Sequence, residues 1–441
     1  MHFNKNDYFE YDGQKITILD LLGEGGQGEV YLVNDGTSNY AFKYYKEIPS
    51  DDFKFNLKNN IIKGAPSSAF LWPKKYIEFD DETCGYLMDI RSKDYTSFVS
   101  YLNAKTKFKD QTTLINWCVE LVKSFKLLHE KGFSYQDLND GSFFLNPETG
   151  ALLICDNDNV SADKTNLGIL GKMRYMAPEI VRGDKDPYTN DRQMPDTHSD
   201  RFSLAVILFL ALCLGNPFEG ERLKKYVIVD EKAEYEMFGS NPIYIYNKDD
   251  TSNRPIRGYH TAVLNRYPSL PNYIKEAFHR TFTDGLKDRE NSRTTEIEWL
   301  RLLSKYRDEL ITCYGCGKQY IFGFNEKKNN ATCPFCNKET KTFCFLHIGK
   351  SYIALEPGKF IYEPHIDKYS SEYNKPIGKV IQNKNNPSLW GIKLRLNNDV
   401  LIRDKTGVEK AVSKDGVIPI LSYLKIKFND SAIGEIIVQS K

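Results

Sequence analysis

The chain has 441 residues, and its 60 lysines and arginines against 59 aspartates and glutamates give a formal net charge of +1. At about 100 to 200 residues per domain, this length predicts two to four folding units. A hydrophobic content of 41% and a charged content of 27% are typical of globular proteins and exclude a disordered or collagen-like chain. The near-zero charge also argues against nucleic-acid binding as the main function, because neutralising phosphates needs a surplus of cations.

Neither a secretion signal nor a membrane span is predicted. The chain opens MHFNKNDYFEYDGQ, without an apolar core. The longest apolar stretch, residues 202–214, is shorter than the about 20 residues that cross a bilayer. Nine cysteines, four of them in two close pairs, fit a reducing compartment with one metal site better than a disulfide framework. We therefore expect a cytoplasmic protein that is not bound to a membrane.

The first 310 residues change from strand-like to helix-like patterns. Over about residues 16–90, short runs rich in Val, Ile, Tyr and Phe alternate with turns, which predicts strands. From about residue 112 to Gly132, apolar residues recur at three- and four-residue spacing, which is typical of an amphipathic helix ending at a glycine. The sequence predicts an α+β fold with a small strand-rich lobe at about 16–90 and a larger helical lobe at about 91–310.

Two smaller units are predicted after the lobes. Residues 311–342 contain the paired cysteines and too few apolar residues for a core. Residues 345–441 return to short strand-like runs separated by Asn, Asp, Gly and Pro turns, which predicts an all-β sandwich.

A glycine-rich segment lies between two predicted strands. Its members are Gly23, Gly25, Gly26 and Gly28, with Val30 shortly after. Such glycines let backbone amides approach phosphates, although the pattern alone equally describes a flexible hairpin. The strand that follows disfavours a Rossmann dinucleotide site, where a helix is expected. Lys43, in the middle of the next predicted strand, is placed to reach the α- and β-phosphates of a nucleotide.

Two aspartates follow predicted apolar elements of the larger lobe. Asp137 lies in SYQDLNDGS, just after the helix that ends at Gly132, and Asp156 follows the apolar run LLIC. Two separated carboxylates of this kind suit one general base and one ligand for a hard cation.

Over about residues 16–310, the order of these motifs resembles the eukaryotic-like protein kinases. Asp137 matches their catalytic-loop aspartate, and Asp156 matches the first residue of their DFG triplet. MAPE, ending at Glu179, matches their APE motif, and Arg293 matches the arginine that pairs with its glutamate. The resemblance implies a bilobal protein kinase-like fold over residues 1–310 and transfer of the γ-phosphate of ATP to protein hydroxyls.

The same resemblance assigns the nucleotide and metal contacts. The residues expected at ATP are Gly23, Gly25, Gly26, Gly28, Val30, Lys43, Met88 and Asp156. The expected ligands of Mg²⁺ or Mn²⁺ are Asp156, Ser142 and Asp158. Asp137 is expected to act as the base, with Lys43 as the second catalytic residue.

Several departures from the family's pattern keep two functions open. No glutamate lies between Glu47 and Glu78, where the family has a helix glutamate that pairs with the strand lysine. The helix is expected near residues 52–63, with Asn56, Asn59 or Asn60 facing Lys43, or with Asp51 or Asp52 substituting. The catalytic loop has Gln136 instead of arginine, and Asn139 where Ser/Thr kinases have lysine. The chain is therefore an active Ser/Thr-type kinase or, alternatively, a pseudokinase scaffold or nucleotide sensor, and transfer of another group such as AMP also stays open.

Within the family, one bacterial subgroup is more similar. SYQDLNDGSFFL, LLICDNDNV, LWP in the small lobe and the paired cysteines resemble kinases encoded beside von Willebrand-type and protein-phosphatase partners in tellurite-resistance-linked triads. The resemblance implies bacterial signalling or stress response, with a von Willebrand-type protein as substrate and a cognate phosphatase as partner.

The spacing of four cysteines predicts a zinc ribbon. Cys313 and Cys316 form one CxxC pair, and Cys333 and Cys336 form a second pair after sixteen residues. Four thiolates give a closed tetrahedral zinc site, which is structural and not catalytic. Two disulfides are the alternative, and nucleic-acid binding by the ribbon is disfavoured by its mild charge.

The last unit, residues 345–441, weakly resembles a forkhead-associated β-sandwich. The similar parts are the segment LWGIKL, the turn KDG and the final strands. The Gly-Arg, Ser-x-x-His and Asn-Gly elements that grip phosphothreonine are missing. We therefore expect a degenerate module that contacts proteins or dimerises, or a plain sandwich without a ligand.

Overall fold

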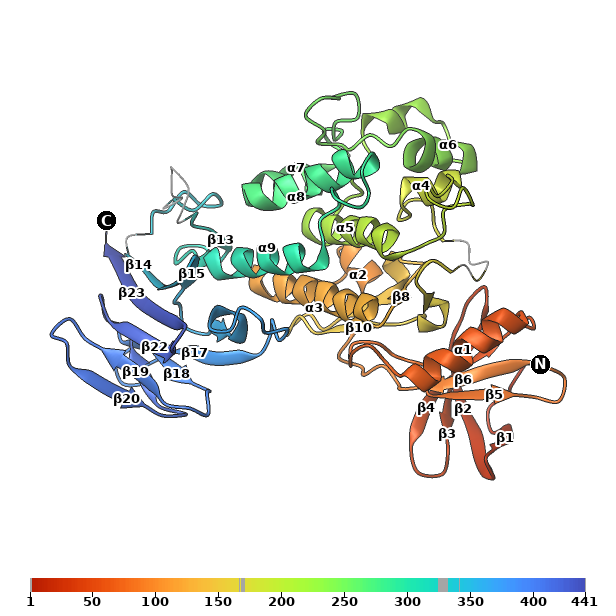
Figure 1. Cartoon of the computed structure of the whole chain (residues 1–441), viewed down its shortest axis with the longest axis horizontal. Helices are drawn as coiled ribbons and strands as arrows, with labels where there is room; N and C mark the ends of the chain where they lie inside the picture. Colours follow the sequence, from red (N-terminus) through yellow and green to blue (C-terminus); the bar gives the residue numbers. More distant parts are fainter. Residues whose placement is uncertain (1, 166, 168–170, 324–331, 341, 441) are drawn as a thin grey trace.

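The computed structural model describes residues 2–165, 167, 171–323, 332–340 and 342–440. The small lobe and the β-rich C-terminal part lie on opposite sides of the helical large lobe (Figure 1). Among the helices of these residues, none has both the length and the apolar character needed to span a bilayer.

One antiparallel sheet forms the small lobe. Its strands are β1 (Tyr8–Tyr11), β2 (Gln14–Glu24), β3 (Gly28–Asn34), β4 (Asn39–Tyr45), β5 (Lys75–Glu78) and β6 (Cys84–Met88), in the order β1-β2-β3-β4-β6-β5. The sheet begins before residue 16, because β1 pairs with β2 and adds Phe9 to the apolar face. Phe3 and Phe9 pack with Phe42 and Tyr44 of β4, and such aromatic clusters stabilise a sheet face by burying large areas.

Helix α1 (Asp51–Lys63) is the predicted helix of the small lobe and begins one residue earlier than expected. The Ser50 side chain accepts a hydrogen bond from the Phe53 backbone at its start, and Gly64 ends it at φ +69°. Phe53 and Leu57 are buried, so the helix packs onto the sheet through its apolar side while Asp51 and Asp52 stay exposed.

The large lobe is mainly helical. Its helices are α2 (Phe98–Leu102), α3 (Gln111–Glu130), α4 (Pro178–Arg182), α5 (Thr197–Cys213), α6 (Glu231–Tyr235), α7 (Thr261–Arg266), α8 (Asn272–Phe282) and α9 (Glu296–Glu309). Its short strands are β7 (Thr96–Ser97), β8 (Phe133–Ser134), β9 (Phe143–Leu145), β10 (Leu152–Ile154) and β11 (Ser161–Ala162). Single turns are η1 (Asp140–Ser142), η2 (Asn157–Asn159), η3 (Glu221–Lys225), η4 (Glu236–Ser240), η5 (Tyr267–Ser269) and η6 (Asp284–Leu286).

Helix α5 lies at the centre of the large lobe and is apolar on all sides. Every residue from Phe202 to Cys213 is buried, which fits a helix enclosed by neighbours. Asp200, in its first turn, accepts a hydrogen bond from the Tyr135 backbone at 2.7 Å and contacts His129 at 3.0 Å. Burial alone would lower the pKa of His129, but its hydrogen bonds to Asp200 and Glu296 raise it to about 9. The segment that carries Asp137 is thus anchored to a charged, buried network.

The C-terminal part contains a hairpin and two antiparallel sheets. The hairpin pairs β12 (Leu310–Thr312) with β13 (Gln319–Ile321). The first sheet, in the order β15-β14-β23-β22-β19-β20, contains β14 (Thr342–Ile348), β15 (Ser351–Ala354), β19 (Val400–Arg403), β20 (Glu409–Val412), β22 (Lys425–Asn429) and β23 (Ala432–Ser440). The second contains β16 (Phe360–Tyr362), β17 (Pro376–Gln382), β18 (Trp390–Leu394) and β21 (Val417–Pro419), with the turn η7 (Glu363–His365) after β16. Apolar residues of both sheets share one core; the forkhead-associated resemblance stays a prediction.

The C-terminal part is fixed to helices α3 and α9 by buried polar contacts. Arg307 of α9 lies over the Tyr362 ring at 3.5 Å and donates to the Tyr373 carbonyl at 2.9 Å. The His365 ring contacts the Asp308 carboxylate at 2.8 Å, and Asn374 donates to a side chain of α3. These contacts come from several strands and turns, so the two parts pack as one unit.

Candidate active site and cysteine cluster

The glycine-rich turn connects β2 to β3 and requires glycine at its end. A Cβ atom on Gly28 would clash with the Tyr44 carbonyl, whereas Cβ atoms on Gly23 or Gly26 would meet open space. The Gly25 backbone N–H donates to the Gly28 carbonyl at 2.9 Å and closes the turn. The turn is therefore open around Gly23 and Gly26; that its glycines contact ATP stays a prediction.

Lys43 is buried in the middle of β4, with 6% of its surface exposed. Its ammonium donates to the Asp158 carboxylate at 2.7 Å, lies 3.8 Å from Asp156 and reaches Gln27 of the glycine turn at 3.5 Å. Burial alone would lower the pKa of Lys43, but Asp158 and Asp156 raise it above its ordinary value. The structure thus brings together the predicted lysine, the glycine turn and both aspartates of the DND segment.

The prediction that a residue of helix α1 pairs with Lys43 is wrong. Asn56 and Asn60 donate instead to the Val160 carbonyl, at 2.8 and 2.7 Å. Asp51 and Asp52 are exposed, and the carboxylate bonded to the lysine is Asp158. The sequence pattern did not indicate this pair, because the two residues are far apart along the chain.

The turn that carries Asp156 is anchored by the next residue, Asn157. Asp156 adopts a left-handed conformation, with φ 55° and ψ 41°, and its side chain is 52% exposed. Asn157, where the family has phenylalanine, is fully buried and donates to the Leu71 and Ile154 carbonyls at 2.8 and 2.9 Å. Hydrogen bonds from Asn157 to the backbone therefore take the place of the apolar contacts that a phenylalanine would make, and they fix the turn that presents Asp156.

Asp137 lies in a polar cradle that includes one unexpected lysine. Burial raises the pKa of Asp137, while hydrogen bonds from the Asn139 side chain and the Lys172 backbone act to lower it. The Lys172 ammonium donates to the Asn139 amide oxygen at 3.2 Å and lies 3.8 Å from Asp140. Sequence analysis missed Lys172; its position directly before the MRYMAPE segment was the available signal.

The remaining predicted site residues fall around these groups. Ser142 is buried, and its carbonyl accepts the Cys155 backbone N–H at 2.9 Å, so that it lies beside the segment of Asp156. Val30 and Met88 belong to one apolar cluster that also includes Leu153 of the large lobe. This cluster offers an apolar surface between the lobes.

The predicted pair of Glu179 and Arg293 is confirmed. The two nitrogen atoms of the guanidinium each donate to one carboxylate oxygen at 2.7 Å, and Arg293 is 1% exposed. The pair joins α4 to the segment before α9, and both side chains are almost fully enclosed, which indicates a structural role.

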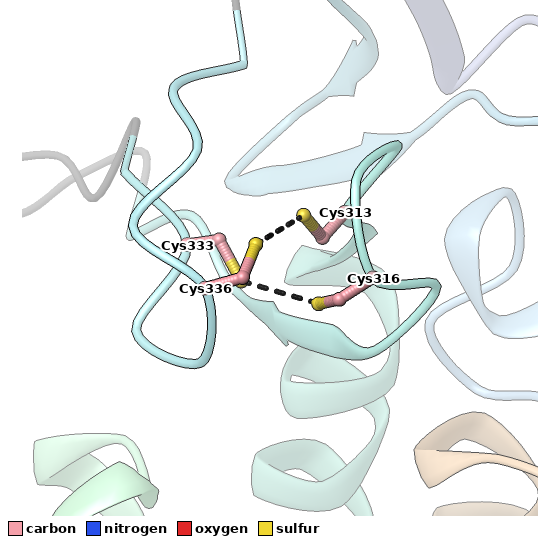
Figure 2. A group of neighbouring side chains, drawn as sticks. All are labelled: Cys313, Cys316, Cys333 and Cys336. Atoms are coloured by element: carbon pink, nitrogen blue, oxygen red, sulfur yellow. Dashed lines mark hydrogen bonds between the residues drawn. The ribbon is translucent and has the colours of Figure 1, made fainter.

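The four paired cysteines come together in one cluster (Figure 2). Their sulfur atoms all lie within 4.8 Å of one another. Cys313 and Cys336 are 3.5 Å apart, and Cys316 and Cys333 are 3.7 Å apart. The four cysteines are free in the structure and not joined as disulfides, and their side chains converge as in a tetrahedral thiolate site. Residues 324–331 and 341 of the predicted ribbon lie outside the described residues.

Comparison with known proteins gives the family of the first 300 residues. A family model described as "Protein kinase domain" matches residues 16–300. Human ribosomal protein S6 kinase alpha-2 is 25% identical over 250 residues, which is 54% of this chain and 32% of that protein. Human serine/threonine-protein kinase Nek11 is 23% identical over 231 residues, 49% of this chain and 34% of that protein.

A solved structure, the autoinhibited serine kinase domain of the giant muscle protein titin, aligns with a TM-score of 0.47 and 15% identity, over 65% of this chain and 78% of that one. The chain spans about a third of the length of the curated relatives it matches. Because the family model matches more than half of its residues, the chain belongs to the protein kinase domain family.

Proposed function

We propose that the protein is an ATP-dependent phosphotransferase that moves the γ-phosphate of ATP to a hydroxyl group of a protein, as a Ser/Thr-type kinase. The observation that carries this proposal is the convergence of Asp137, Asp156 and the paired Lys43 in one site between the lobes. Both curated relatives named above are kinases by name, and Nek11 is a serine/threonine-protein kinase by name, which agrees with the proposed reaction.

The residues of the site fit ATP with Mg²⁺ or Mn²⁺. The open glycine turn offers backbone amides, and the Lys43 ammonium offers a cation for the α- and β-phosphates. The half-exposed Asp156 carboxylate and the nearby Ser142 hydroxyl are oxygen ligands of the kind a hard cation prefers. The metal, when bound, would neutralise phosphate charge. Val30 and Met88 supply apolar surface for a purine.

Asp137 would act on the acceptor hydroxyl. Its carboxylate would accept the hydroxyl proton, while Asn139 and the Lys172 backbone hold it in orientation. The Lys172 ammonium, 59% exposed beside this loop, would supply a cation to the transferring phosphate. Asn139 occupies the position of the catalytic-loop lysine of Ser/Thr kinases, so this cation comes from another segment.

The test is incubation of the purified chain with ATP and Mg²⁺ or Mn²⁺, read by intact mass and phosphosite mapping. We expect a gain of about 80 Da per modified site. A gain of about 329 Da would show AMP transfer and replace the proposed reaction while keeping the site. No gain, with nucleotide binding retained, would favour the pseudokinase scaffold or nucleotide sensor.

We also propose the finer assignments that follow from the bacterial subgroup. These are a cytoplasmic role in bacterial signalling or stress response, a von Willebrand-type domain protein as substrate, and a cognate protein phosphatase. The DND segment around Asp156 and the cysteine cluster support them. A purified von Willebrand-type domain protein that gains phosphate only in the presence of this chain would agree with the proposal.

We propose that the cysteine cluster holds one structural Zn²⁺. Purified protein should contain about one zinc per chain, and Cys316→Ser should lose it and lower the thermal midpoint, because structural zinc supplies folding energy. Metal content by emission spectroscopy and thermal unfolding measure both effects. Cys344→Ser, outside the cluster, is the control; zinc retained in Cys316→Ser would contradict a four-cysteine site.

A further inference from the structure

Lys43 is a buried cation, and helix α1 lacks the glutamate that pairs with this lysine in the family's pattern. Lys43 lies in strand β4 with 6% of its surface exposed, so its charge needs a carboxylate close by. Two polar side chains of helix α1, Asn56 and Asn60, face the large lobe, and both donate to its Val160 carbonyl instead of bonding Lys43.

Asp158 has the geometry of that missing partner. One of its oxygens accepts hydrogen bonds from the Lys43 ammonium at 2.7 Å and from the Tyr45 hydroxyl at 2.6 Å. Both donors are on β4, and the Tyr86 hydroxyl of β6 also interacts with this carboxylate. Asp158 is 0% exposed, whereas Asp156 is half exposed. The Lys43 and Tyr45 donors share the Oδ2 atom of Asp158, while its Oδ1 atom is buried without a hydrogen-bond partner among the described residues. The half-exposed Asp156 carboxylate is the one that is open to a metal.

We propose that Asp158 positions Lys43 toward the nucleotide phosphates and takes the place of a carboxylate on helix α1. The inference rests on the proposed function in so far as the site binds a nucleotide. Asp158 is then a positioning residue, and its expected role as a third magnesium ligand is given up.

This arrangement changes what controls the lysine. Asp158 and Asp156 are two residues apart in one turn that Asn157 ties to the backbone. The orientation of Lys43 is therefore set by the same turn that presents the metal ligand. Helix α1 contributes no carboxylate to the ion pair; it contacts this region through the amides of Asn56 and Asn60 and through Phe53, whose ring packs on Tyr45.

The first experiment is a double-mutant cycle on the full chain without nucleotide. Asp158→Asn and Lys43→Met should each lower the thermal midpoint, and the double variant should lose less than the sum, because no buried charge is then left unpaired. If Asp158→Asn alone fails to fold, we expect the double variant to fold again, and this recovery would show the same coupling between the two residues. Additive losses, or a double variant that fails to fold when Lys43→Met folds, would overturn the pair. This measurement is independent of whether the protein transfers phosphate.

The second experiment separates positioning from metal binding. Calorimetric titrations with ADP at a series of Mg²⁺ concentrations give the Mg²⁺ concentration at which ADP binding is half-maximal. We expect this concentration to be the same in Asp158→Asn as in the unchanged protein, within about twofold. Asp156→Asn should raise it by about tenfold or more. If turnover is established, Asp158→Asn should lower kcat by about 10- to 100-fold, with no further loss when Lys43→Met is added.

The matched control is Asp52→Asn, which makes the same chemical change at an exposed carboxylate of α1. It should leave stability, Mg²⁺ dependence and turnover unchanged. The proposal would be refuted by a higher Mg²⁺ requirement in Asp158→Asn. It would also be refuted if Asp52→Asn lost as much turnover as Asp158→Asn. Absence of phosphate transfer in the unchanged protein would count against the proposed function alone, because the cycle and the titrations do not depend on it.

Discussion

Replacing Asp137 with asparagine is expected to slow phosphate transfer by about 10²- to 10⁴-fold while nucleotide binding is retained. Asparagine has the shape of aspartate, so the contacts with Asn139 and the Lys172 backbone can persist. It cannot accept the proton of the substrate hydroxyl. The measurements are the rate of phosphate incorporation from ATP and the affinity for ADP by calorimetry.

The control for this prediction is Asp94→Asn, the same change at an exposed position of the chain. It should leave the rate unchanged. Full activity in Asp137→Asn would remove this residue from the role of base. Loss of both transfer and ADP binding would instead report a folding defect, which the thermal midpoint would reveal.

Replacing Arg293 with methionine is expected to destabilise the protein by about 3 kcal/mol, because it removes the two-bond partner of the buried Glu179. Arg289, 3.5 Å from this carboxylate, then remains to balance part of its charge. Burial acts to raise the pKa of Glu179, but the Arg293 guanidinium holds it below its ordinary value. Methionine keeps much of the apolar volume of arginine, so the loss comes mainly from the charge and its hydrogen bonds. Urea unfolding followed by fluorescence measures the change in free energy.

Two variants make this second result interpretable. Adding Glu179→Gln to Arg293→Met should recover part of the stability, because the second change removes the uncompensated charge. Arg280→Met breaks a partly exposed pair with Glu298, 2.9 Å long, and should cost no more than about 1 kcal/mol. A loss in Arg293→Met as small as that one would show that the buried pair contributes little.

Local sequence patterns were sufficient for much of the fold. Residues 202–214 are apolar on all faces of a helix apart from Ser203, and a helix with that pattern is stable only inside a lobe, as α5 is. Gly28 and Gly132 occupy positions where a side chain would clash or φ is positive. The cysteine spacing likewise implied a four-sulfur cluster, since each CxxC pair is local and two pairs complete one tetrahedral site.

Local sequence patterns could not predict which charged residues of the site pair with each other. Lys43 and Asp158 are separated by 115 residues, and neither hydropathy nor helical period carries information about which carboxylate meets a buried ammonium. The missing glutamate on α1 directed attention to Asp51 and Asp52, which are close in sequence but exposed. Closeness in the sequence gave the wrong partner, because Lys43 of the small lobe pairs with Asp158 of the large lobe where the two lobes meet.

The sequence by itself therefore determined the order of the lobes, the glycine turn and the cysteine cluster, and it singled out Asp137 and Asp156 as the carboxylates proposed to react. Each of these depends on residue type and short spacing. Only the tertiary structure decided that Asp158 holds Lys43 and that Lys172 joins Asp137. Both contacts join segments that are distant in the sequence. For Lys43 and Asp158, which are both buried, the cost of burying a charge selects the partner that lies within hydrogen-bonding distance.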